Sequence, residues 1–262
     1  MKKYMVIIVI GLALAVSSHA RNNTRADSLL IVARETLENA INLWEEKPLQ
    51  DSRARFERLL NQTDYPFLVH YYIAYADYNL TNFYQATESS EMAAKYLDDG
   101  IQHLEKSIEL HENFAESHAL LSTLFGQKIA LSPLKAMYLG PRSNAAMQKA
   151  LKLEPTNPRV HLLAGINAKF TPKMFGGGRE KARKHLRDAG DLFTRYQPKS
   201  LLYPDWGHRD VYAWLGIVAI DSDSLDAAKS YFEKALEIDP NYSWVKYRLL
   251  PALEEKMSGD SK

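Results

Sequence analysis

Between Tyr212 and Pro240, small and apolar residues recur at the spacing expected of two short helices that pack against each other. Gly216, Ala228 and Ala235 are small, which allows two antiparallel helices to approach closely. Pro240 has no backbone donor and therefore ends the second helix. The segment thus predicts a pair of antiparallel helices joined by a turn.

The positions of these residues resemble the tetratricopeptide (TPR) repeat, a helix pair that recurs along a chain. Tyr212 and Ala219 stand where the family usually has Trp and Tyr, and both remain apolar. The resemblance implies an α-solenoid that presents a binding surface and performs no chemistry of its own. The matching residues are Leu215, Gly216, Leu225, Ala228, Phe232, Ala235 and Pro240.

Weaker copies of the unit precede it. Ala150 and Pro155 keep the closing spacing of one copy, and Gly165 takes the place of Gly216 in the next. We therefore expect an all-α fold of about five antiparallel TPR-like helix pairs, followed by a C-terminal capping helix. Helices are expected at residues 25–46, 50–62, 66–80, 90–110, 114–130, 142–153, 158–170, 178–194, 208–220, 223–237 and 241–257. Asp51 and Ser143 are expected as N-caps, and Pro158 in a first helical turn.

The first residues have the pattern of a cleavable signal peptide. Lys2 and Lys3 precede an apolar run from Met5 to Val16, which ends at the small-x-small triplet Ser18–Ala20. The alternative is a transmembrane anchor, for which this run is shorter than the ~20 residues needed. The predicted organisation is a signal peptide at residues 1–20, followed by a single TPR-like helical domain at 21–262 with no integral membrane segment.

Cysteine content and charge limit the compartment and the partners. The chain has no cysteine, which excludes a lipoprotein anchor, disulfides and thiolate metal sites. An exported chain without disulfides suits the bacterial periplasm, where we expect this protein to reside. The 33 basic and 32 acidic residues nearly balance and are interspersed, so no nucleic-acid partner is expected.

Several helix pairs are longer than the family repeat. Extra residues fall at about 81–90, 131–141 and 171–177, each between the two helices of a pair. Equivalent turns align along one edge of a solenoid, so we expect them to form a rim that binds a partner. The alternative is that their aromatic residues pack under their own turns. The candidate rim residues are Phe83, Tyr84, Met137, Tyr138, Arg142, Met174 and Phe175.

The concave face is a second candidate surface. The first helix of each pair lines it with mostly apolar residues, which suggests a hydrophobic peptide, a partner helix or a lipophilic ligand. The alternative is that the stack closes this groove and the residues are core. Residues 197–209 form one more long connection, expected to be a packed loop. The candidate groove residues are Tyr71, Tyr78, Leu162, Ile166, Phe170 and Ile217.

Two motifs could carry other chemistry. Gly176–Gly178 precede a helix, as in an anion-binding loop, but the spacing of a phosphate-binding loop is absent. The same segment, within residues 149–191, resembles the T component of tripartite ATP-independent periplasmic (TRAP) transporters, which implies a protein that partners a solute-binding subunit. His111 and His118 lie two helical turns apart beside Glu112 and Glu116, where a metal site or a plain polar face is possible.

The sequence therefore predicts a periplasmic TPR scaffold that binds a protein or peptide partner through its concave face and its rim. The alternative function is an accessory of a transport system that holds a small lipophilic or anionic solute. No catalytic constellation is found, so we expect neither an enzyme nor a cofactor or metal site.

Overall fold

The computed structural model describes residues 25–259, and every regular element in this range is helical. The predicted signal peptide lies outside the described residues. Residues 25–43 form the helix at the start of this range, here called the N-terminal helix. The helices that follow are α2 (Glu46–Glu57), α3 (Pro66–Ala86), α4 (Ser90–Leu110), α5 (Ala115–Leu131), α6 (Ala136–Leu153), α7 (Pro158–Phe170), α8 (Arg179–Phe193), α9 (His208–Ile220), α10 (Leu225–Ile238) and α11 (Leu250–Ser258).

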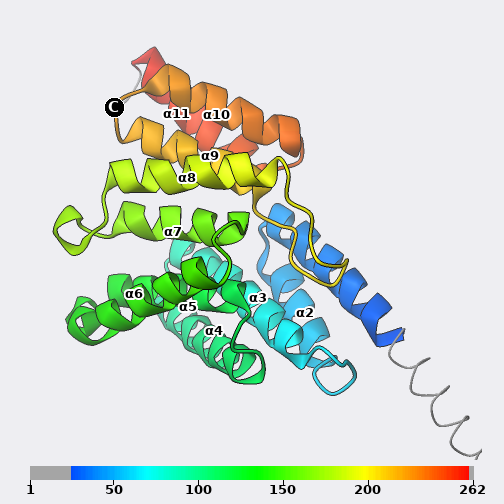
Figure 1. The fold of residues 1–262 in the computed structure, drawn as a ribbon. Coiled ribbons are helices and arrows are strands. Elements are labelled where there is room, and N and C mark those ends of the chain that lie inside the picture. Colours follow the sequence, from blue (N-terminus) through cyan, green and yellow to red (C-terminus); the bar gives the residue numbers. More distant parts are fainter. Residues whose placement is uncertain (1–24, 260–262) are drawn as a thin grey trace, which may run out of the picture.

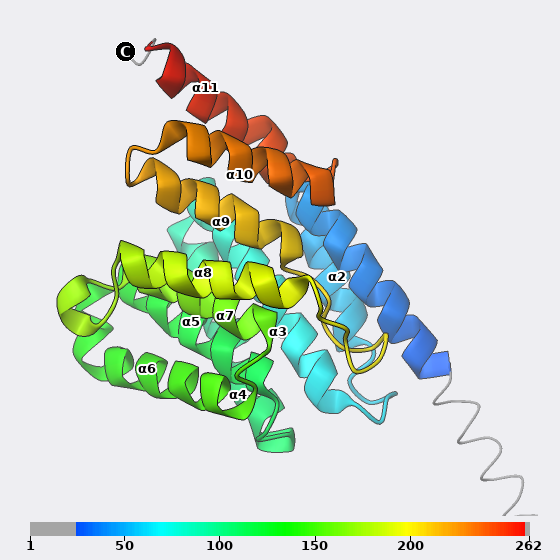
Figure 2. The same ribbon diagram turned by 45° about the horizontal axis from the view of Figure 1, so that its top comes forward.

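Consecutive helices pack side by side in pairs, and the pairs stack in chain order (Figures 1 and 2). The most extensive contacts join α3 to α4, α5 to α6, α7 to α8 and α9 to α10, and α11 packs against α10. One connected apolar core runs through the stack, from Leu30 to Leu253. The predicted α-solenoid of helix pairs with a C-terminal capping helix is confirmed.

The close approach predicted within the pairs occurs at two glycines. A Cβ atom on Gly216 would lie 2.3 Å from the ring of Phe232, and one on Gly165 would lie 2.7 Å from Cγ of Leu186. Ala228 has no exposed surface, as its place between α9 and α10 requires. The small residues therefore set the distance between the two helices of a pair.

Two of the three extended turns expected from the sequence are largely helical instead. The helix α3 continues to Ala86 and α6 begins at Ala136, so the extra residues mainly lengthen helices. A short 3-10 turn at Pro133–Lys135 precedes α6. Only residues 171–178, between α7 and α8, form the longer turn that the repeat spacing predicted.

Two of the candidate rim residues, Phe83 and Tyr84, lie in the C-terminal turns of α3 and pack against neighbouring side chains. Tyr84 is buried and stacks on Tyr96 with ring centroids 5.5 Å apart, while its hydroxyl donates to Glu46 Oε1 at 2.7 Å. Phe83 is half-buried and packs edge-on against Trp44. These two aromatics are therefore local core, which was the alternative to a place on the rim.

The helix starts also differ from expectation in part. Asp51 and Ser143 lie inside α2 and α6 and are not N-caps. Pro158 does occupy the first turn of α7, and the N-cap there is Asn157, whose side chain accepts from the backbone N–H of Arg159 at 3.0 Å. Asn157 and Pro158 therefore determine where α7 begins, because asparagine favours the N-cap and proline favours the first helical turn.

The N-terminal helix packs on residues far away in the chain. Arg34 donates to the carbonyl of Tyr203 at 2.9 Å and pairs with Asp205 at 3.4 Å. Arg209, in the first turn of α9, pairs with Glu38 at 3.3 Å. Figure 1 shows this helix in blue beside the yellow connection between α8 and α9. These contacts therefore hold the N-terminal helix against the connection between α8 and α9 and against the first turn of α9.

Candidate functional site

The concave face is filled by residues 197–207, which form most of the connection between α8 and α9. The indole of Trp206 stacks on Tyr75 with ring centroids 4.4 Å apart, and its N–H donates to the hydroxyl of Tyr71 at 3.1 Å. Trp206 is 8% exposed and Tyr71 is fully buried. The connection is thus the packed loop expected from the sequence, and it occupies the face on which a partner was expected to bind.

A second contact anchors the same connection. The hydroxyl of Tyr72 donates to the carbonyl of Leu202 at 2.8 Å. Burial raises the pKa of both Tyr71 and Tyr72 well above the usual range for tyrosine. These hydroxyls therefore stay protonated and act as hydrogen-bond donors or acceptors that hold the connection in place.

The six predicted groove residues divide by exposure. Half of them are core, in agreement with the alternative that the stack closes the groove. A partner could reach those three only by displacing the chain's own residues. Tyr71, Leu162 and Ile166 are buried, Tyr78 and Ile217 are half-buried, and Phe170 is 67% exposed.

A buried ion pair also contacts the connection between α8 and α9. Arg159 on α7 and Glu116 on α5 are 0% and 2% exposed, and Oε1 of Glu116 accepts from Nε of Arg159 at 2.9 Å. Asn157 also donates to Oε1 of Glu116, at 2.8 Å. Arg159 further donates to the hydroxyl of Tyr196 and to the carbonyl of Trp206. This network joins two helix pairs to the connection and is structural.

Among the described residues, the six most exposed large apolar side chains lie on or beside two neighbouring turns. The turns between α5 and α6 and between α7 and α8 lie side by side at one edge of the stack, on the left in Figures 1 and 2. Exposed apolar side chains that cluster on a protein surface often mark an interaction site. The residues, here called the apolar rim, are Leu134 (97% exposed), Met137 (91%), Tyr138 (67%), Phe170 (67%), Met174 (83%) and Phe175 (73%).

The turn between α7 and α8 is built to project Met174 and Phe175. Gly176 and Gly178 have φ values of 82° and 107°, which favour glycine. A Cβ atom on Gly177 would lie 2.0 Å from the backbone oxygen of Thr171. The three glycines therefore let the chain fold back tightly after the two exposed apolar residues.

The same glycines have no donors to offer an anion. The N–H groups of Gly176, Gly177 and Gly178 donate to the backbone oxygens of Lys173, Pro172 and Ala168, at 3.0, 3.2 and 2.7 Å. An anion-binding loop needs such N–H groups to point outward. The three glycines therefore serve to reverse the direction of the backbone, and the turn does not form a phosphate site.

Arg142, the predicted cation of the rim, is already engaged. Its guanidinium lies 4.6 Å from the ring centroid of Phe125 and 5.3 Å from that of Tyr138. It also donates to the hydroxyl of Tyr138 at 3.1 Å and pairs with Glu105 at 3.0 Å. Arg142 therefore orients Tyr138 and is not a free charge for an anionic ligand.

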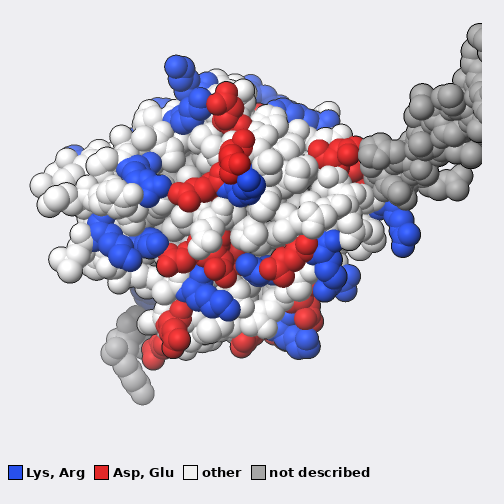
Figure 3. Space-filling view, turned by 90° about the horizontal axis from the view of Figure 1, so that it is seen from below, with Lys and Arg blue, Asp and Glu red and all other residues white. Residues whose placement is uncertain are grey.

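The charged side chains on the face shown in Figure 3 do not indicate a binding surface for a charged partner. Basic and acidic side chains alternate across it, as expected from the sequence, and no region of one sign dominates. The left edge, where the two turns of the apolar rim lie, is mostly uncharged. Recognition there would rest on apolar contact rather than on electrostatic steering.

His111 and His118 do not form the site considered from the sequence. Nε2 of His118 lies 2.8 Å from the backbone oxygen of Glu112, and burial lowers the pKa of this histidine. Glu116 pairs with Arg159, so its carboxylate is not free to join them.

Family comparisons identify a TPR unit where the sequence pattern is strongest. Residues 210–242 match the tetratricopeptide repeat, and residues 29–121 match the glutathione S-transferase C-terminal domain. No curated protein matches the chain. Among the helices of residues 25–259, none combines the length and the apolar content that a membrane crossing requires. The chain thus contains a TPR repeat at the position from which the fold was predicted.

Solved structures of similar shape agree with this assignment. The HusA haemophore from Porphyromonas gingivalis is 20% identical, with a TM-score of 0.60, over 74% of this chain and 93% of its own. A thermophilic TPR protein from Thermus thermophilus is 16% identical, with a TM-score of 0.58, over 84% of this chain and 98% of its own. At these identities the likeness concerns the fold, which is of the TPR type. The resemblance to the T component of TRAP transporters stays a prediction.

Proposed function

We propose that this protein is an exported, periplasmic TPR scaffold that binds a protein or peptide partner through the apolar rim. The observation that carries the proposal is the gathering of six large apolar side chains, each at least 67% exposed, on two adjacent turns. TPR folds are suited to hold partners and do not supply catalytic groups of their own. With the concave face filled, the rim offers a partner the most exposed large apolar side chains of the described residues.

The rim favours an apolar partner segment. Met137 and Met174 are flexible and polarizable, so they adapt to partners of different shape. Tyr138 and Phe175 supply large aromatic area, which is enriched at the centre of protein interfaces. We therefore expect an amphipathic helix or an apolar peptide whose nonpolar side chains lie across both turns.

Site-specific photo-crosslinking in the native cell tests this proposal. A photoreactive residue at Met137 or Met174 is expected to yield a discrete crosslinked partner. The same residue at Leu201 or Tyr247, which are 65% and 66% exposed but lie outside the rim, is the matched control and is expected to yield none. Equal crosslinking from all four positions, or crosslinks from the controls alone, would refute the rim as the contact surface.

A second candidate function is the binding of haem or another flat lipophilic solute at the same rim. Its support is the fold shared with a haemophore, together with methionine and tyrosine side chains of the kind that ligate haem iron. It corresponds to the solute-holding alternative drawn from the sequence. Titration with haem, followed by its visible absorption, separates the two functions. Haem binding that is lost when Met137, Tyr138 and Met174 are changed to Ser would favour the haemophore-like role, and no spectral change would exclude it.

A further inference from the structure

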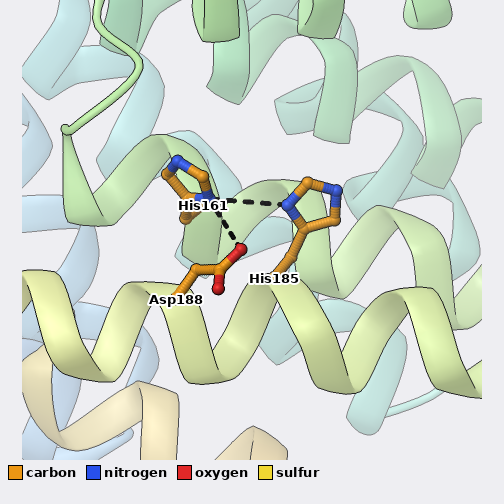
Figure 4. A group of neighbouring side chains, drawn as sticks. All are labelled: His161, His185 and Asp188. Carbon is orange, nitrogen blue, oxygen red and sulfur yellow. Dashed lines mark hydrogen bonds and ion pairs between the residues drawn. The ribbon is translucent and has the colours of Figure 1, made fainter.

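We propose that His161, His185 and Asp188 form a binding site for a divalent transition-metal ion such as Zn²⁺. His161 projects from α7 toward α8, which carries the other two residues (Figure 4). Nδ1 of His161 lies 3.5 Å from Nδ1 of His185 and 3.9 Å from Oδ2 of Asp188. Within residues 25–259, this is the one group of three such side chains whose ligand atoms all lie within 4.8 Å of one another.

The hydrogen bonding of His161 prepares its Nδ1 for a metal. Nε2 of His161 lies 2.8 Å from the backbone oxygen of Pro155. A carbonyl oxygen can only accept, so Nε2 carries the hydrogen and Nδ1 of the neutral ring holds a free lone pair. Metal-binding histidines commonly donate their other N–H to such a carbonyl, which fixes the ring and its tautomer. Figure 4 shows Nδ1 of His161 joined by dashed lines to both His185 and Asp188.

His185 and Asp188 are suited to the same role by their spacing on α8. Residues three apart share one face of a helix, so both side chains face α7 together.

The distances suit a tetrahedral ion. Zn–N bonds of about 2.0–2.1 Å place neighbouring ligand atoms about 3.3–3.5 Å apart in a tetrahedron. The separation of the two Nδ1 atoms, 3.5 Å, meets this requirement. Oδ2 of Asp188, 3.9 Å from Nδ1 of His161, has to approach that atom by about half an ångström. It first has to release Lys184, whose Nζ lies 2.9 Å from Oδ2 of Asp188. Three protein ligands leave a fourth position open to water or to a group of a bound partner.

A second histidine pair provides an internal comparison. His70 on α3 and His103 on α4 face each other with their Nδ1 atoms 2.8 Å apart, and burial lowers the pKa of His103 to about 4. Among the described residues, no carboxylate completes this pair as Asp188 completes the other. We therefore expect it to bind metal poorly.

Calorimetric titration of the full chain with Zn²⁺ tests the proposal, and titration with Co²⁺ adds a visible spectrum that reports the coordination geometry. We expect one ion per chain, a Co²⁺ spectrum of a four-coordinate site, and binding at least about tenfold weaker for His185→Asn or Asp188→Asn. His103→Asn is the matched control and should bind as the wild type does. Lys184→Ala removes the competing cation and should strengthen binding, an effect that a purely structural role would not produce.

Thermal unfolding of each variant without metal distinguishes a lost ligand from a lost fold. His185→Asn is expected to unfold cooperatively, as the wild type does, while losing the stabilisation by Zn²⁺. The proposal is overturned if the wild type binds no Zn²⁺, or if His185→Asn and His103→Asn bind it equally well.

Discussion

Replacing Arg159 with alanine is expected to lower the free energy of unfolding by about 3–5 kcal/mol, because it leaves the carboxylate of Glu116 buried without its counter-ion. Arg159 and Glu116 are 0% and 2% exposed, so the carboxylate of Glu116 has no bulk water beside it. The substitution also removes the donors to Tyr196 and to the carbonyl of Trp206. Urea unfolding followed by circular dichroism measures the loss.

The double variant Arg159→Met with Glu116→Leu is the control for this prediction. It removes both charges and fills part of the space with apolar side chains, which is often close to neutral for a buried pair. We expect it to recover most of the lost stability, although Asn157 then lacks one acceptor. If Arg159→Ala unfolds within about 1 kcal/mol of the wild type, the pair is not buried as described.

Replacing Gly216 with alanine is expected to destabilise the protein by about 2–3 kcal/mol through overpacking. The new Cβ atom would meet three ring atoms of Phe232 at distances of 2.3–2.9 Å. Phe232 is fully buried, so its ring cannot turn out toward solvent without leaving the core. Relief therefore requires α9 and α10 to separate, which disrupts the TPR unit.

Gly126→Ala is the matched control, because Gly126 also lies in a helix, α5, and a Cβ atom there would meet nothing within 4 Å. Alanine is favoured over glycine within helices by about 0.5–1 kcal/mol, so this variant should be as stable as the wild type or more so. Thermal unfolding of the two variants side by side measures the difference. Equal effects of the two substitutions would contradict the close approach of α9 and α10.

The fold could be predicted from the sequence because its signals are local. Gly216, Ala228 and Pro240 lie within one helix pair, and their spacing reports that pair directly. The ends of the helices were harder to predict from the sequence. Residues 81–86 continue α3 because Tyr84 packs on Tyr96 of α4, and the periodicity of a single segment does not contain that contact.

The candidate site depended on contacts between distant residues. Trp206 meets Tyr71 and Tyr75, which lie far earlier in the chain, so the register that placed these tyrosines on the concave face could not show what covers them. The aromatic and proline content of residues 197–207 did indicate packing, but not the surface that receives it. The hydrogen bond from Arg34 to the carbonyl of Tyr203 could not be predicted from the sequence for the same reason.

The rim and the histidine site illustrate two further limits. Met174 and Phe175 could be placed on an exposed turn because the glycines after them mark a sharp reversal. His161 and His185 lie 24 positions apart on different helices, and only the antiparallel packing of α7 on α8 brings them together. In the sequence, the seven-residue spacing of His111 and His118 was a stronger indication of a metal site than the positions of His161 and His185. Among the described residues, however, His111 and His118 do not belong to a group of three ligands.

Hydrogen exchange of the Trp206 indole N–H, followed by NMR, tests most directly whether the chain fills its own concave face. This N–H is buried against the hydroxyl of Tyr71, whereas the other three tryptophans of the chain, Trp44, Trp214 and Trp244, are half-buried. The signal is assigned by its loss in Trp206→Phe. We predict that the Trp206 indole exchanges far more slowly than the other three. Exchange as fast as that of a solvent-exposed indole would mean that residues 197–207 leave the face open, and the concave surface would again be the place to look for the partner.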